Sequence, residues 1–197
     1  PKPQRNHPAS TYQRFRALPV AEIAQALDQI YDLHHQLAAA GWVACDLYDG
    51  CMIYDFANRC WHVMDLDTYH QGPLVNTMGR MFGSSRFMAP EEFELGATID
   101  QRTTVFTLGR MAVLFLGDGS GVRAGFRGDD ALYQVVDRAL RRFGGLPAFV
   151  SQELFNEFLL PEEFHHAHRQ EPALRELTTT LETDTKNISI ELDSFNR

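Results

Sequence analysis

The chain has 197 residues, of which 44% are hydrophobic and 22% are charged, a composition typical of a folded globular domain. Its 18 basic and 26 acidic residues give a net charge of −8 at pH 7, which argues against a surface that follows nucleic-acid phosphates. The three cysteines have no CxxC spacing, so they predict neither a disulfide framework nor a zinc site, and we expect a cytoplasmic location. No apolar run reaches the roughly 20 residues that span a bilayer, so we expect no membrane partner.

The first forty residues predict an extended segment followed by one long helix. Residues 1–19 are rich in proline and basic side chains and predict an extended lead-in, with room for a short helix at Ala9–Phe15. From Val20 to Ala40, apolar residues recur at the i, i+3, i+4, i+7 spacing of a helix with one buried face. Pro19 favours the start of this helix, and Gly41 favours its end.

After Gly41 the pattern changes to short strands and loops. Met52–Phe56 and Cys60–Met64 predict a small β-hairpin. Residues 68–85 contain many turn residues and predict a long functional loop. A short helix is expected at 90–95, and the nearly continuous apolar run Thr103–Leu116 predicts a helix buried on all sides.

The C-terminal third predicts a loop and further helices. Residues 117–128 are glycine-rich but lack the strand-to-helix context of a phosphate-binding loop. Helices are expected at Asp129–Phe143 and Ser151–Leu160, because each has a capping residue at its start. A broken helix over 162–181 and a weakly alternating tail complete the chain. The prediction is a mainly helical protein with one small hairpin.

Three carboxylate-bearing segments follow one another in a fixed order. Asp46 lies in the loop ACDLYDG, Asp65 begins the sequence DLD, and Glu91 belongs to GSSRFMAPEE. The ordered set resembles the catalytic loop, the DFG segment and the APE motif of the eukaryotic-type Ser/Thr protein kinase superfamily, in a divergent bacterial form. The resemblance implies a mainly α fold, the C-terminal (large) lobe of a protein kinase, with a small β-hairpin that carries the catalytic and metal-binding loops.

The same resemblance implies a domain organisation. Residues 20–160 correspond to the C-terminal lobe, residues 1–19 to a lead-in after an N-terminal lobe and hinge, and residues 161–197 to a C-terminal helical extension and tail. The chain has no glycine-rich phosphate lid and no room for one before Val20. We therefore expect the N-terminal lobe in an intact parent protein, and negligible affinity for ATP in this chain alone.

The roles of individual residues also come from the resemblance. It implies that Asp46 accepts or orients the proton of the substrate hydroxyl, and that Asp65 holds Mg²⁺ against the phosphates of ATP. Ser84 matches the hydroxyl residue that steadies the base and the substrate loop. Glu91 matches the APE glutamate, for which we expect Arg142 as the buried partner and Arg141 as the second choice. The expected cofactors are ATP and Mg²⁺, and the expected partner is a protein substrate with Ser or Thr.

The metal-binding positions depart from the kinase pattern. Cys51 stands where the second metal ligand is normally asparagine, and a thiol is a poor ligand for Mg²⁺. We expect either Asp49 to replace it or one metal site to be lost. Asp67 replaces the glycine of the DFG segment, as in small-molecule kinases, and can add a metal-binding oxygen.

Three further departures lie around the catalytic loop. The His and Arg that precede the base are Ala44 and Cys45, which removes the usual partner of a phosphorylated activation loop. The lysine that contacts the γ-phosphate is Tyr48, and the aspartate that opens the central helix is Thr104.

Several functions compete at this point. The leading hypothesis is the C-terminal lobe of a Ser/Thr protein kinase-like phosphotransferase that is active in the intact parent protein. The DLD sequence favours a small-molecule phosphotransferase of the aminoglycoside or choline kinase type. The residues Tyr48, Cys51 and Thr104 favour a pseudokinase that binds partners without catalysis. A histidine metal site at His165, His166 and His168 is disfavoured, because two adjacent histidines on a helix cannot both face one ion.

Overall fold

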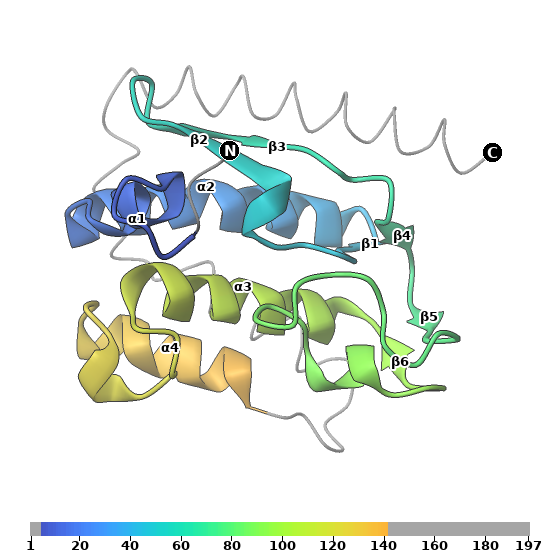
Figure 1. The fold of residues 1–197 in the computed structure, drawn as a ribbon. Coiled ribbons are helices and arrows are strands. Elements are labelled where there is room, and N and C mark those ends of the chain that lie inside the picture. Colours follow the sequence, from blue (N-terminus) through green and yellow to red (C-terminus); the bar gives the residue numbers. More distant parts are fainter. Residues whose placement is uncertain (1–4, 142–197) are drawn as a thin grey trace.

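The structure is a computed structural model and describes residues 5–141 of the chain (Figure 1). Two long helices, α2 (Val20–Ala39) and α3 (Gln101–Leu116), lie at its centre, and α1 (Thr11–Arg16) and α4 (Asp130–Leu140) flank them. The predicted helix-rich fold is confirmed for this part of the chain. None of its helices has the length and apolar character needed to cross a membrane. The predicted segments Ser151–Leu160 and 161–197 lie outside the described residues.

Short strands and 3₁₀ helices connect the long helices. The strands form three separate antiparallel pairs, β1 with β4, β2 with β3 and β5 with β6. Their bounds are β1 Trp42–Val43, β2 Met52–Asp55, β3 Cys60–Val63, β4 His70–Gln71, β5 Leu74–Val75 and β6 Thr98–Ile99. The 3₁₀ helices are η1 Asp49–Cys51, η2 Pro90–Phe93 and η3 Arg123–Gly125.

Side-chain caps explain where three of the helices begin. The side chains of Ser10, Asp100 and Asp129 each accept a hydrogen bond from a backbone N–H in the first turn of α1, α3 and α4. Such a cap satisfies one of the donors that a helix start leaves unpaired and contributes about 1 kcal/mol. Gly41 follows α2 with a φ of 87°, a conformation that glycine adopts without strain, which matches the predicted end of this helix.

The core forms around α3, which packs against α2 on one side and α4 on the other. Leu108, Met111, Ala112 and Leu116 of α3 are fully buried. Phe15 of α1 lies among aromatic side chains from three other elements, with ring centroids 4.7 Å from Tyr54, 4.9 Å from Trp61 and 5.0 Å from Phe115. These contacts attach the hairpin and α1 to the central helices.

The β2–β3 hairpin confirms the prediction made from its alternating pattern. Its register pairs Met52 with Val63 and Asp55 with Cys60. The buried Met52 and Tyr54 turn their side chains toward the core, whereas Ile53 between them is 52% exposed. The hairpin therefore has one face in the core and one face toward solvent, as the two-residue period of a strand requires.

One buried histidine ties α2 to the loop that follows the hairpin. The Nδ1–H of His34 donates to the carbonyl of Ile30 at 2.7 Å, and its Nε2 accepts the hydroxyl of Tyr69 at 2.7 Å. Burial lowers the pKa of His34 to about 4, so the ring is neutral at pH 7. His34 is thus a hydrogen-bonded core residue.

Candidate active site

The two carboxylates of the predicted site lie at the same end of the β2–β3 hairpin. Asp46 precedes η1, which leads directly into β2, and only Met64 lies between the end of β3 and Asp65. The hairpin pairing brings these segments together, and the N–H of Met64 donates to the carbonyl of Cys51 at 2.8 Å. The backbone itself thus sets the separation between the two aspartate-bearing loops.

Both aspartates have an unusual backbone conformation. Asp46 has a φ of 56° and Asp65 a φ of 65°; Arg59, in the hairpin turn, is the other non-glycine residue with positive φ in the described part of the chain. Aspartate tolerates this left-handed region better than most residues, but the conformation still costs on the order of 1 kcal/mol. Strain of this kind concentrates at functional sites, where it fixes the direction of a side chain.

The carboxylate of Asp46 lies in a negatively charged and partly buried environment. Burial raises its pKa, and the charges of Asp65 and Asp67 raise it further. Its Oδ1 atom is buried without a hydrogen-bond partner among residues 5–141. An unpartnered buried carboxylate oxygen is costly, and a cation or a donated proton would relieve that cost.

Backbone and side-chain hydrogen bonds hold the Asp46 loop in place. The N–H of Ala44 donates to Thr104 Oγ1 at 3.0 Å, which connects the loop to α3. The hydroxyl of Thr68 donates to the carbonyl of Cys45 at 2.9 Å, and the thiol of Cys51 donates to the carbonyl of Asp46 at 3.2 Å. Thr104 therefore anchors the loop although it departs from the kinase pattern.

The segment 83–92 approaches the Asp46 carboxylate at Gly83. Gly83 has a φ of 123°, a conformation that strains other residues, and a Cβ atom on it would lie in tight contact with Asp46 Oδ1 at 3.2 Å. Phe87 and Ala89 of this segment are fully buried. Glu92 caps the start of η2, because its Oε2 accepts a hydrogen bond from the N–H of Ala89 at 2.6 Å. The segment is thereby fixed beside the candidate base.

Within the described residues, Glu91 contacts a threonine of α3. Its Oε1 accepts the hydroxyl of Thr103 at the start of α3, with a distance of 2.8 Å. Arg141, which directly follows α4, pairs with Asp137 of that helix, so it is engaged elsewhere. Arg142, the first choice for this role, lies outside the described residues.

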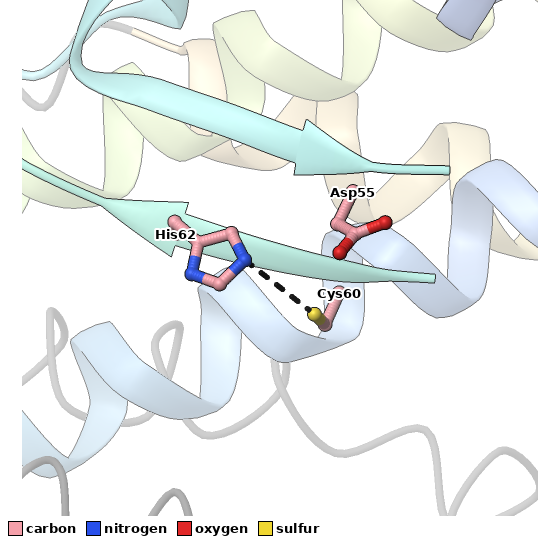
Figure 2. A group of neighbouring side chains, drawn as sticks. All are labelled: Asp55, Cys60 and His62. Atoms are coloured by element: carbon pink, nitrogen blue, oxygen red, sulfur yellow. Dashed lines mark hydrogen bonds between the residues drawn. The ribbon is translucent and has the colours of Figure 1, made fainter. Parts of the chain in front are cut away.

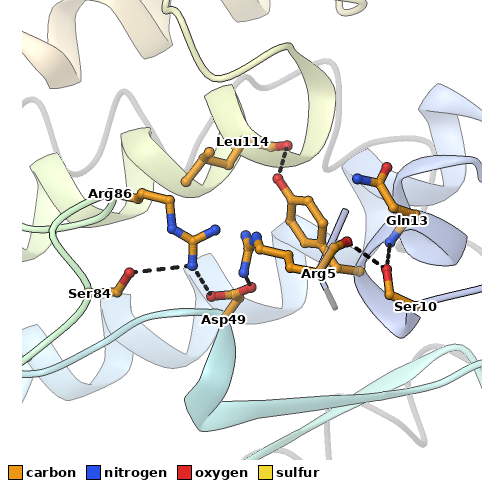
Figure 3. A network of polar contacts seen from close by, with 8 residues as sticks. Arg5, Ser10, Gln13, Asp49, Ser84, Arg86 and Leu114 are labelled. Carbon is orange, nitrogen blue, oxygen red and sulfur yellow. Dashed lines mark hydrogen bonds and ion pairs between the residues drawn. The ribbon is translucent and has the colours of Figure 1, made fainter. Parts of the chain in front are cut away.

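Asp49 and Ser84 belong to a network of arginines (Figure 3). The Asp49 carboxylate forms ion pairs with Arg5 and, at 3.5 Å, with Arg86. Arg86 also donates to the hydroxyl of Ser84 at 3.4 Å, and the Arg5 guanidinium lies over the ring of Tyr12. Two cations already neutralise Asp49, so a metal ion would have to displace them to bind there.

A cavity of about 420 Å³ adjoins this network. It lies between α1 and the β2–β3 hairpin, and neither Asp46 nor Asp65 lines it. Its walls combine aromatic side chains with one ion pair, and the lining residues include Arg5, Asp49, Tyr12, Phe15, Trp61 and Phe115. Asp65 lies outside this cavity, and its side chain is exposed to solvent.

Comparison with models of known protein families finds no match, and comparison with curated protein sequences finds none either. The interpretation of the site therefore depends on the residues of this chain and their arrangement.

A second group of polar side chains was not predicted from the sequence. Asp55, Cys60 and His62 have donor atoms that all lie within 4.8 Å of one another, and no other trio of His, Cys, Asp or Glu in the described part of the chain is as compact. The cysteine spacing gave no sign of this group. The hairpin register could have indicated it, because paired and alternate residues share one face.

Proposed function

We propose that this chain is the C-terminal lobe of an ATP-dependent Ser/Thr protein kinase-like phosphotransferase. The observation that carries the proposal is the placement of Asp46 and Asp65 in strained loops at one end of a single hairpin, with electrostatically coupled carboxylates. The segment that ends in Ala89-Pro90-Glu91 approaches Asp46 at Gly83, which supports the assignment of this segment as a substrate-facing loop. The order along the chain and the arrangement in space therefore support the same function.

In this proposal Asp46 is the catalytic base. It accepts the proton of a Ser or Thr hydroxyl while that oxygen forms a bond to the γ-phosphorus of ATP and the bond to the ADP oxygen breaks. The pKa of Asp46 is raised by burial and by the neighbouring aspartates, which makes it a stronger base than an exposed carboxylate. Its Oδ1 has no hydrogen-bond partner in the described residues, so no protein donor competes for that oxygen.

The hard oxygen donors beside Asp46 fit Mg²⁺. Mg²⁺ keeps several waters and needs only one or two protein carboxylates, so a compact trio is unnecessary. We assign Asp65 and Asp67 as its protein ligands, because Asp49 is paired with two arginines and the Cys51 thiol donates to a backbone carbonyl. When bound, the ion would neutralise charge on the phosphates that Asp65 and Asp67 alone would repel.

The exposed face of the hairpin supports a role for a second lobe. Ile53 of β2 is 52% exposed, and Met64, which directly follows β3, is 45% exposed. In the proposed enzyme the adenine ring of ATP and an N-terminal lobe pack against this apolar surface. Burying it upon binding would stabilise the closed form through the hydrophobic effect.

Phosphate transfer to a protein substrate tests the proposal in a protein that joins this chain to the N-terminal lobe that the proposal requires. Asp46→Asn should lower kcat by roughly 10²–10⁴-fold, because it removes the general base while preserving size. Asp137→Asn on α4 is the matched control and should leave kcat unchanged, since its ion pair with Arg141 lies outside the site. Unchanged activity in Asp46→Asn would rule out this role for Asp46.

A pseudokinase is the second candidate. The ion pairs of Asp49 and the hydrogen bond of the Cys51 thiol favour it, because both residues at the second metal position are already engaged. A pseudokinase would label no substrate and would be indifferent to Asp46→Asn. Labelling of small molecules but never of proteins would instead favour the small-molecule phosphotransferase that the DLD sequence suggests.

A further inference from the structure

The turn end of the β2–β3 hairpin presents three potential metal ligands on its solvent-facing side (Figure 2). Cys60 and His62 are alternate residues of β3, so their side chains leave the same face of the strand. Asp55 is the direct cross-strand partner of Cys60. The antiparallel register therefore brings the three side chains together without any long loop.

The distances between the donor atoms are close to those of a bound ion. The sulfur of Cys60 lies 4.0 Å from Nε2 of His62, and the three donor atoms are all within 4.8 Å of one another. A tetrahedral zinc ion, with Zn–S of about 2.3 Å and Zn–N of about 2.05 Å, places sulfur and nitrogen about 3.6 Å apart. Small side-chain rotations on a fixed hairpin close the remaining gap.

We propose that Asp55, Cys60 and His62 bind a zinc-class divalent transition metal, with water completing a tetrahedral site. A thiolate and an imidazole select borderline and soft ions such as Zn²⁺ over Mg²⁺ and Ca²⁺, which prefer oxygen ligands. Three protein ligands with one open position is an arrangement that zinc readily adopts. This site is chemically distinct from the Mg²⁺ site proposed beside Asp46, and it lies at the opposite end of the same hairpin.

The carboxylate of Asp55 is held in position before any ion arrives. Its Oδ1 accepts the N–H groups of Ala57 at 2.8 Å and Asn58 at 3.1 Å, and its Oδ2 accepts Nδ2 of Asn58 at 2.7 Å. These bonds fix the orientation of the carboxylate. A carboxylate has about four acceptor positions, so one remains for a metal. Outer-shell bonds of this kind orient ligands in metal sites.

Cys60 is the accessible thiol of this chain. The sequence contains three cysteines, and the structure describes all of them. Cys45 and Cys51 are buried, whereas Cys60 is partly exposed beside the exposed His62. An ion from solvent can therefore reach Cys60 and His62 together.

Cobalt substitution of the metal-free 197-residue chain tests the proposal, because a thiolate ligand gives Co²⁺ a charge-transfer band in the near ultraviolet. We expect one Co²⁺ per chain, with this band, displaced by one equivalent of Zn²⁺. Cys60→Ser should abolish the band, and His62→Gln should weaken Co²⁺ binding at least about tenfold. Asn58→Ala, which removes one outer-shell bond to Asp55, should weaken it by about 10–100-fold or less. His70→Gln on β4 is the matched control for an exposed strand histidine and should change nothing.

The result that overturns the proposal is a protein that shows no thiolate band with Co²⁺, or one whose band persists in Cys60→Ser. Cobalt held by His165, His166 and His168 would give no thiolate band and would therefore count against the site. Near-ultraviolet circular dichroism of Trp61, which lies between Cys60 and His62, verifies that each variant keeps the hairpin packed. Asp46→Asn should leave the band intact, so this test is independent of the proposed phosphotransfer.

Discussion

Replacing the buried Glu92 by glutamine should change how the stability of the protein depends on pH. Glu92 is 3% exposed, and burial raises its pKa from 4.5 to about 7, with smaller contributions from Glu91 and Asp46. Because the folded pKa lies above the unfolded one, the associated stability is complete below pH 4.5 and is lost as the pH rises through 7. A shift of about 2.5 pH units at 1.36 kcal/mol per unit corresponds to about 3 kcal/mol.

Glu92→Gln isolates this effect because it removes the charge and keeps an oxygen that can accept the N–H of Ala89. The variant should match the wild type near pH 4 and exceed it by about 3 kcal/mol at pH 8. Urea denaturation followed by fluorescence of the buried Trp42, repeated between pH 4 and pH 8, measures the difference. Glu94→Gln, at an exposed position, is the control and should run parallel to wild type. A constant difference in the free energy of unfolding between Glu92→Gln and the wild type at every pH would refute the reasoning.

Two further predictions concern the buried residues His34 and Thr104, whose side chains form hydrogen bonds to segments next to the candidate site. Burial lowers the pKa of His34 to about 4, so its stability contribution is present above pH 6.5 and is lost as the pH falls through 4. In urea denaturation, the free energy of unfolding of His34→Phe should not show this loss at acid pH. The same fall in stability between pH 6.5 and pH 4 in the variant and the wild type would contradict the prediction. Thr104→Val keeps the shape of the side chain but leaves the buried N–H of Ala44 without its acceptor, which should cost about 1–3 kcal/mol. Thr98→Val, at an exposed position, is the control, and equal losses in the two variants would show that the bond to Ala44 contributes nothing.

The long helices could be predicted because their signals are local. The apolar period of α2, the following Gly41 and the capping Asp129 of α4 lie within a few residues of the elements they define. The β1–β4 and β5–β6 pairs could not be predicted, since strands of two residues carry no measurable alternation.

The candidate site was predictable only in part. The order of Asp46 and Asp65 indicated which carboxylates to examine, and the hairpin between them explains why their loops meet. The arginines that neutralise Asp49 could not be foreseen, because Arg5 and Arg86 are distant in the sequence and only the folded chain brings them together. Contacts of this kind depend on tertiary packing, which no local pattern encodes.

The bond between the Met64 amide and the Cys51 carbonyl has a consequence for how tolerant the site is to substitution. Main-chain groups join the two aspartate loops, so the gap between a proton acceptor and a metal carboxylate does not depend on which side chains face the solvent. Ile53, on the exposed face of the hairpin, can therefore vary to suit a ligand or a partner. Only changes that alter strand length or shift the pairing would move one reactive group relative to the other.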